Sequence, residues 1–306
     1  MNIGESNMET QHSGSVKEIH VIDDSTLEFE FTDRISVFDK LIPSTIPGKG
    51  ESLCKEGKFW FEKTASLGVK THFIGLSAPN RMRVRRVNII RDYDAISSST
   101  TNYLIPLEFI ARHYVAGSLF DRIQKGKVAA EDAGFEPGHK VRYGEKLPRP
   151  YVETSTKLEK IDRLLDIDEA LSISGLSQEE YDNIVTIILK IDAAIEEEVS
   201  KRGLIHVDGK KEFAFDENRE IMIIDVFGTA DEDRYWDKDA WENGECVELS
   251  KEFVRKHYEQ TGYKQELYKA RDEKRDEPPI PPLPEDLVQD ASKLYADMLY
   301  KLTGGV

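Results

Sequence analysis

The chain has 306 residues, of which 39% are hydrophobic and 33% are charged, and its formal net charge is −16. This composition is typical of a soluble globular protein, and the acidic charge argues against broad binding to nucleic acids or membrane surfaces. Two cysteines are too few for a disulfide framework or a structural zinc site, and the lack of a long apolar run or signal-like start favours a cytoplasmic protein.

The N-terminal part is predicted to be rich in strands. Residues 1–12 are polar and expected to be disordered, and residues 14–31 have the alternation of a β-hairpin. Gly14 would let the backbone approach a ligand closely, and Lys17 could then reach a phosphate, although a lysine on a strand is more often simply solvated. Further elements are expected at residues 52–67 (a helix) and at 71–76 and 82–87 (strands).

The stretch 104–118 is apolar on both sides of Arg112. A lone arginine within a strand needs an anionic partner, which would be either Glu108 or a phosphate. Gly117 and Ser118 could offer a backbone N–H and a hydroxyl to the same anion. Residues 154–157 form another candidate loop for contacting an anion.

A helix and a hairpin are predicted in the second half. Residues 177–202 have a capping box and an apolar stripe, which indicates a helix against the core. In the hairpin that follows, Asp208, Lys210 and Glu212 fall on alternate residues and therefore share one face of a strand. Asp225 ends the second strand. Two carboxylates beside a lysine suit Mg²⁺ on a nucleoside triphosphate, but this stretch alone favours the alternative of a solvated charged face.

The C-terminal part is expected to hold a Pro-rich connector, residues 278–284, and a terminal helix, residues 285–302. The sequence contains no internal repeat and neither a GxGxxG nor a Walker A pattern.

Several segments together resemble the phosphoribosylaminoimidazole-succinocarboxamide synthase (SAICAR synthetase) family, especially its longer fungal-type members. The similar segments are collinear and cover about residues 13–257: they are 32–50, 104–118, 148–157, 207–213 and 229–236. The resemblance implies an α+β fold in two parts, related to ATP-grasp and kinase-like architectures, with ATP in a cleft between antiparallel-sheet lobes. We expect these lobes at residues 13–103 and 104–306.

The resemblance also implies a reaction. An ATP-dependent ligase would join a carboxyaminoimidazole ribonucleotide to L-aspartate through an acyl phosphate, in purine biosynthesis. Such chemistry needs Mg²⁺ and well-placed cations more than a protein nucleophile. ATP, Mg²⁺ and these two small-molecule substrates are the expected partners, with no nucleic acid or membrane, and the enzyme would be a monomer or a homodimer.

The resemblance assigns roles to individual residues. ATP would be bound by Gly14, Ser15, Lys17, Glu212 and Asp225, of which Glu212 and Asp225 would also hold the metal. The ribonucleotide 5′-phosphate would be held by Arg112, Ser118 and Arg234. Asp208 and Lys210 would face the imidazole ribonucleotide and the reacting groups. The aspartate side would involve Ser36, Asp39 and Lys157.

The chain departs from the family pattern near the expected ATP site. Ser15 stands where members usually have a lysine, and Val226 stands where they usually have a second acid. Lys211 also replaces an apolar residue. Two alternatives therefore stay open: a divergent member that uses the same ATP cleft on another carboxylate and amine, and an inactive nucleotide-binding paralogue.

Overall fold

The computed structural model describes residues 10–13, 16–249 and 251–305, and the chain divides into two compact units. The first unit takes its described residues from 1–59, 73–86 and 248–306, and the second comprises 60–72 and 87–247. The expected lobes were continuous ranges, whereas the first unit combines both ends of the chain. Its C-terminal segment is bonded to its N-terminal one: Leu283 N donates to Ser44 Oγ (2.9 Å), and Ser292 Oγ donates to the Pro47 carbonyl (2.7 Å).

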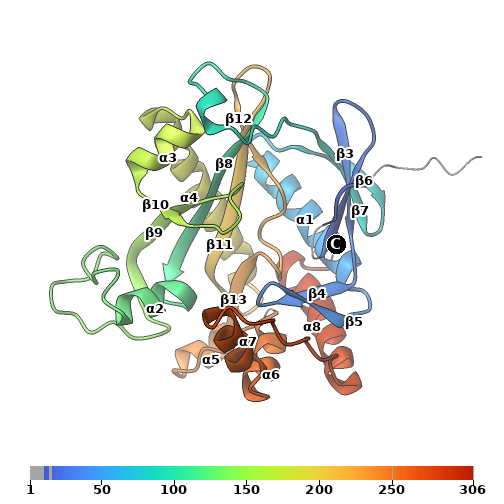
Figure 1. Cartoon of the computed structure of the whole chain (residues 1–306), viewed down its shortest axis with the longest axis vertical. Coiled ribbons are helices and arrows are strands. Elements are labelled where there is room, and N and C mark those ends of the chain that lie inside the picture. Colours follow the sequence, from blue (N-terminus) through green and yellow to red (C-terminus); the bar gives the residue numbers. More distant parts are fainter. Residues whose placement is uncertain (1–9, 14–15, 250, 306) are drawn as a thin grey trace, which may run out of the picture. The chain divides into compact units, whose positions relative to one another are not determined.

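The first unit contains an antiparallel sheet of five strands in the order β1-β2-β3-β7-β6. Figure 1 labels β3, β6 and β7 of this sheet, which lie side by side. The strands are β1 (Thr10–Ser13), β2 (Lys17–Val21), β3 (Thr26–Phe31), β6 (Phe73–Ala78) and β7 (Arg81–Arg85). A separate hairpin is formed by β4 (Arg34–Val37) and β5 (Lys40–Thr45). Residues 1–12 were expected to be disordered, but residues 10–13 pair with β2, and residues 1–9 lie outside the described part.

Helices complete the first unit. The helix α1 (Lys49–Ser66) begins in this unit and continues into the second, near the range predicted from the sequence. Towards the C-terminus follow α6 (Glu252–Gln260), α7 (Tyr263–Asp272) and α8 (Glu285–Thr303). The Pro-rich residues 278–284 have no helix or strand, because proline cannot donate a backbone hydrogen bond. No helix in the described ranges is both long and apolar enough to cross a membrane.

The second unit is built on an antiparallel sheet in the order β10-β9-β8-β11-β12, with β13 also paired to β11. The strands are β8 (Tyr103–Tyr114), β9 (Lys146–Thr156), β10 (Leu164–Leu165), β11 (Leu204–Phe215), β12 (Ile221–Ile224) and β13 (Asp233–Asp237). The helices are η1 (Tyr93–Ala95), α2 (Gly117–Gln124), α3 (Ile167–Ser174), α4 (Gln178–Ser200) and α5 (Lys238–Glu242). The long strand β11 pairs with three others and is the centre of the unit.

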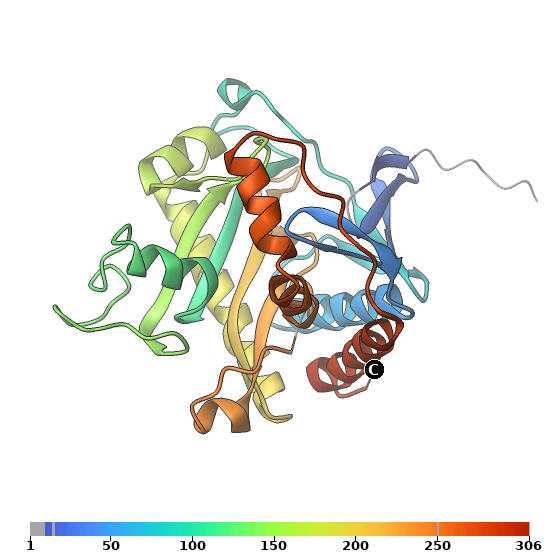
Figure 2. The same cartoon turned by 60° about the horizontal axis from the view of Figure 1, so that its bottom comes forward.

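The helix α4 lies along one face of this sheet (Figure 2). Its N-terminus has the predicted capping box between Ser177 and Glu180, and its buried stripe includes Ile184, Ile188 and Ile195. Covering one face with an apolar stripe leaves the polar side chains of the other face available for binding. The same stripe contains one acid, Asp192, which is buried.

Candidate active site

The face of β11 opposite α4 carries the charged residues singled out in the sequence. The register places Asp208 opposite Arg112 of β8, and Glu212 opposite Glu108. Lys210 lies between them, and its Nζ is 3.0 Å from Glu108 Oε1 and 3.1 Å from Glu212 Oε1. The period-two alternation of a strand therefore brings all five side chains to one surface.

Two lysines and two glutamates form a cluster at one end of this surface. Lys157, which follows β9, lies 2.7 Å from Glu212 Oε1 and 3.4 Å from Glu108 Oε1. Burial lowers the pKa of Lys157, but Glu212 and Asp225 outweigh it, so the pKa is raised. The pKa of Lys210 is raised in the same way, with Glu212 as its main acidic neighbour. Both ammonium groups are therefore charged at neutral pH.

Burial is the largest influence on Glu108 and raises its pKa, although Lys210 opposes the change. Glu108 was not among the predicted site residues. Its sequence signal was ambiguous, because it also suited a structural pairing with Arg112. The structure instead places it against Lys210 and Lys157.

The two predicted metal ligands lie at the end of the β11–β12 hairpin. Glu212 pairs with Ile224, and Asp225 follows directly in a left-handed conformation with φ 54°. Asp225 Oδ1 accepts a hydrogen bond from Val226 N (2.8 Å). Glu212 is 2% exposed, and its Oε1 makes ion pairs with Lys157 and Lys210, but within the described chain neither carboxylate oxygen accepts a hydrogen bond. Hard carboxylate oxygens of this kind fit Mg²⁺.

The second group on this face is a set of arginines around two acids. Arg112 donates from Nε and Nη2 to Glu153 Oε1 (2.9 and 2.7 Å) and from Nη2 to Ser118 Oγ (3.1 Å). Its Nη1 lies 3.4 Å from Asp208 Oδ2. Glu108, expected as one possible partner of Arg112, is not the partner. The two residues share a face of β8, but four residues along a strand span about 13 Å, so their side chains are too far apart to pair.

Two further arginines complete this set. Arg122 donates from Nη2 to both carboxylate oxygens of Glu153 (2.8 and 2.7 Å). Arg234 Nη1 lies 3.5 Å from Asp208 Oδ2, and its guanidinium lies over Gly117, where a Cβ would come within 2.7 Å. Arg122 and Glu153 were missed from the sequence. Arg122 looks like an ordinary basic residue in the last turn of a helix, and only strand pairing brings Glu153 beside it.

The remaining predicted site residues belong to the first unit. Lys17 Nζ lies 4.3 Å from the centroid of the Phe29 ring. Ser36 is on β4, and the side chain of Asp39 is 94% exposed, 3.7 Å from Arg271 Nη1. Gly14 and Ser15 lie outside the described residues. The roles predicted for these residues stay predictions.

Comparison with known proteins identifies the relatives of this chain. The family model for SAICAR synthetase matches residues 10–270. The chain belongs to the SAICAR synthetase family. It is 53% identical to the phosphoribosylaminoimidazole-succinocarboxamide synthase of Thermoplasma acidophilum, over 95% of this chain and 97% of the relative. The enzyme of the same name from Thermoplasma volcanium is 51% identical, with the same coverage.

Solved structures of SAICAR synthetases have the same fold. One, a type-2 SAICAR synthetase in complex with ADP, matches with a TM-score of 0.67 and 26% identity, over 96% of this chain and 97% of that one. The Saccharomyces cerevisiae SAICAR synthase complexed with SAICAR matches with a TM-score of 0.76 and 22% identity, over 99% and 98%, and shows the fold alone.

These matches confirm the predicted α+β fold with antiparallel sheets and the predicted carbon–nitrogen ligase of purine biosynthesis. These two Thermoplasma relatives are archaeal, so they show the SAICAR synthetase family without specifying its fungal-type form.

Proposed function

We propose that this protein joins a carboxyaminoimidazole ribonucleotide to L-aspartate, with ATP split to ADP and phosphate. The observation that carries the proposal is the division of one sheet face into two groups. An arginine group around Asp208 suits a phosphate monoester, and the lysine–glutamate group around Glu212 suits a transferring phosphoryl group with its metal. The names of the Thermoplasma relatives support the same reaction.

Arg112, Ser118 and Arg234 would hold the 5′-phosphate of the ribonucleotide. The Nη1 atoms of Arg112 and Arg234 lie 3.4 and 3.5 Å from Asp208 Oδ2. Arg112 Nη2 donates hydrogen bonds to the hydroxyl of Ser118 and to Glu153. A phosphate bound here would share or replace these carboxylate contacts, because bidentate guanidinium pairs favour phosphate as much as carboxylate. Arg122 would keep Glu153 neutralised during that exchange.

Lys157 and Lys210 would act by charge rather than by proton transfer. Their raised pKa values keep both protonated, so neither can serve as a general base at neutral pH. In the proposed reaction the substrate carboxylate takes the γ-phosphoryl group and ADP leaves. The aspartate amine then attacks the acyl carbon, phosphate leaves and the amine loses a proton. Two fixed cations stabilise the negative charge that develops in both steps. Asp208 would orient the ribonucleotide beside them.

Glu212 and Asp225 would hold Mg²⁺: the buried Glu212 carboxylate accepts no hydrogen bond within the described chain, and Asp225 directly follows its strand partner Ile224. When bound, the ion would neutralise and orient the phosphates of ATP. Gly14, Ser15 and Lys17 remain the proposed ATP contacts of the first unit, and Ser36, Asp39 and Lys157 remain the proposed aspartate contacts. The cytoplasmic location, the fungal-type form and the monomeric or dimeric state also remain predictions.

The test is direct. The protein is incubated with ATP, Mg²⁺, the carboxyaminoimidazole ribonucleotide and L-aspartate, and the succinyl product and ADP are measured by chromatography. Equal amounts of both products are expected. ADP formation without the succinyl product, together with an amide product when another amine is supplied, would point to a divergent ligase. Absence of both, with ATP still bound, would point to an inactive paralogue.

A further inference from the structure

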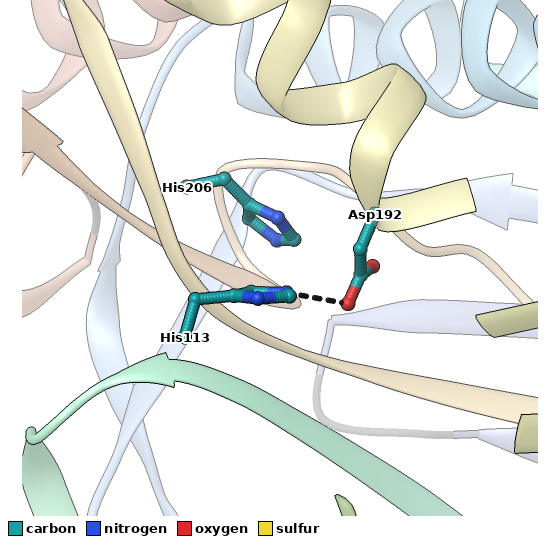
Figure 3. A group of neighbouring side chains, drawn as sticks. All are labelled: His113, Asp192 and His206. Carbon is teal, nitrogen blue, oxygen red and sulfur yellow. Dashed lines mark hydrogen bonds and ion pairs between the residues drawn. The ribbon is translucent and has the colours of Figure 1, made fainter. Parts of the chain in front are cut away.

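A group of two histidines, two acids and a lysine lies on the α4 side of β11, on the opposite face from Asp208 and Lys210, and all of its members except His113 are buried. Figure 3 shows three of its members, His113 of β8, Asp192 of α4 and His206 of β11. One nitrogen or oxygen of each lies within 4.8 Å of the others, and His113 Nε2 is 2.9 Å from Asp192 Oδ2. Two imidazoles and a carboxylate at this spacing are also a candidate site for a divalent metal.

The position of Lys211 argues against a metal ion at this site. Its side chain is fully buried, and its Nζ lies 2.5 Å from Asp192 Oδ1 and 3.7 Å from Asp233 Oδ2. Burial lowers the pKa of Lys211, but Asp192 and Asp233 outweigh it, so the pKa is raised and the group is charged. An ammonium already neutralises Asp192, and at this range it would repel a second cation. Lys211, Asp192, His206 and Asp233 therefore form a buried ion-pair network.

Asp233 connects this network to the backbone. Its Oδ2 lies 2.7 Å from His206 Nε2, and its Oδ1 accepts a hydrogen bond from Gly228 N (2.9 Å). The carboxylate lies against Gly209 of β11, where any Cβ would overlap it. The Asp233 side chain is thus fixed from three directions, and it is fully buried.

The residues on both sides of Asp233 contact the candidate active site. Glu232 Oε2 lies 3.8 Å from Lys210 Nζ, and Arg234 Nη1 lies 3.5 Å from Asp208 Oδ2. Since successive residues of a strand point to opposite faces, Asp233 is directed into the network while Arg234 is directed to the other face. Any shift of Asp233 would therefore move the guanidinium of Arg234.

We propose that Asp233 is a positioning residue that holds Arg234 in place for the ribonucleotide phosphate, anchored by His206 and the Gly228 amide and neutralised by Lys211. This rests on the proposed function, in which Arg234 contacts that phosphate. A displacement of about 1 Å at such a contact can cost up to roughly a hundredfold in activity. The buried network on one face of the sheet therefore controls how well Arg234, on the other face, binds the ribonucleotide.

The test is the variant Asp233→Asn, which keeps the shape of the side chain and removes its charge. We expect the KM for the ribonucleotide to rise between about tenfold and a hundredfold, while the KM for ATP stays nearly unchanged. The matched control is His113→Gln, which alters a contact of Asp192 and leaves the contacts of Asp233 in place. It should lower the melting temperature without changing the KM for the ribonucleotide. If Asp233→Asn does not fold, His206→Gln, which removes one anchor of Asp233 and leaves Lys211 beside it, carries the same measurement.

Arg234→Ala separates this proposal from the proposed function. In its background, Asp233→Asn should have no further effect on the KM for the ribonucleotide. A raised KM in Arg234→Ala with a normal KM in Asp233→Asn would overturn the positioning role alone. A normal KM in Arg234→Ala would instead overturn the phosphate role of Arg234. If Zn²⁺ raises the melting temperature of the chelator-treated native protein and not of His113→Gln, the cluster is a metal site and the ion-pair network is wrong.

Discussion

Lys210 and Lys211 are neighbours on β11, yet they belong to different environments. The side chain of Lys210 is 30% exposed and lies within 4 Å of three glutamates, Glu108, Glu212 and Glu232. Lys211 is fully buried between Asp192 and Asp233, and His206 Nε2 lies 2.7 Å from Asp233 Oδ2. The first face has an excess of acid around its lysines, which suits binding of a further cation. The second is neutralised internally, which suits a support rather than a binding surface.

The largest effect on stability should come from removing a charge from the buried ion-pair network. Lys211→Met removes the cation and leaves Asp192 buried without its main counter-charge, so we expect the free energy of unfolding to fall by about 3–5 kcal/mol. Urea denaturation followed by circular dichroism measures the change. The matched variant is Lys210→Met, one residue away, which should lose activity and much less stability. Equal losses of stability in both variants would contradict the distinction between the two faces.

The next effect concerns the arginines of the open face. Arg112→Ala should weaken transition-state and substrate binding by about 2–4 kcal/mol, because a charge-assisted guanidinium–phosphate contact is lost. We expect the KM for the ribonucleotide to rise strongly and the KM for ATP to change little. Steady-state kinetics with each substrate varied, together with the melting temperature, provides the check. A folded variant with an unchanged ribonucleotide KM would remove Arg112 from the phosphate site.

A somewhat smaller effect is expected at the predicted metal ligands. Asp225→Asn should lower kcat roughly 10- to 100-fold because it weakens the binding of Mg²⁺, while binding of the ribonucleotide stays close to normal. Raising the Mg²⁺ concentration should restore part of the loss, which a titration of activity against Mg²⁺ measures. Should the variant lose stability and remain insensitive to Mg²⁺, Asp225 is a structural acid.

The smallest effect is the pH dependence of the buried face. Burial lowers the pKa of His206, but Asp192 and Asp233 outweigh burial and the repulsion of Lys211, so the pKa is raised in the folded protein. His113 is the other titratable ring against it, at 5.5 Å between centroids. The stabilisation from protonated His206 is fully present below the unfolded pKa of about 6.5 and is lost as pH rises through the folded value.

Urea denaturation from pH 6 to pH 9 tests this. The stability difference between the native protein and His206→Gln should shrink with rising pH, by at most about 1.4 kcal/mol per pH unit. A difference that stays constant over this range would show that His206 does not change its protonation there.

The two faces also differ in how far the sequence reveals them. Strand alternation was enough to place Asp208, Lys210 and Glu212 together, because their period is a local property. The partner of Arg112 was not predictable, since Glu153 reaches it only through the pairing of β8 with β9. The buried network had two readable signals. Asp192 interrupts an apolar helical stripe, and a buried acid requires a counter-charge. Lys211 replaces an apolar residue of the family pattern, but nothing local paired it with Asp192.

The division into units was less predictable still. The boundary at residue 103 was drawn from the first signature segment, but residues 248–306 join the N-terminal strands through contacts such as Lys40 with Glu277 (2.9 Å). A contact more than two hundred residues apart leaves no trace in a local pattern. The period of the terminal helix predicts a buried face and not the segment that covers it.

The composition of the first unit from both ends of the chain has a consequence for synthesis on the ribosome. The second unit is contained within residues 60–247 and can complete its sheet while the C-terminal helices are still being made. The first strands must wait until α8 (Glu285–Thr303) has emerged before their own unit is whole. The nascent chain should therefore become resistant to protease first in its middle and last at its two ends.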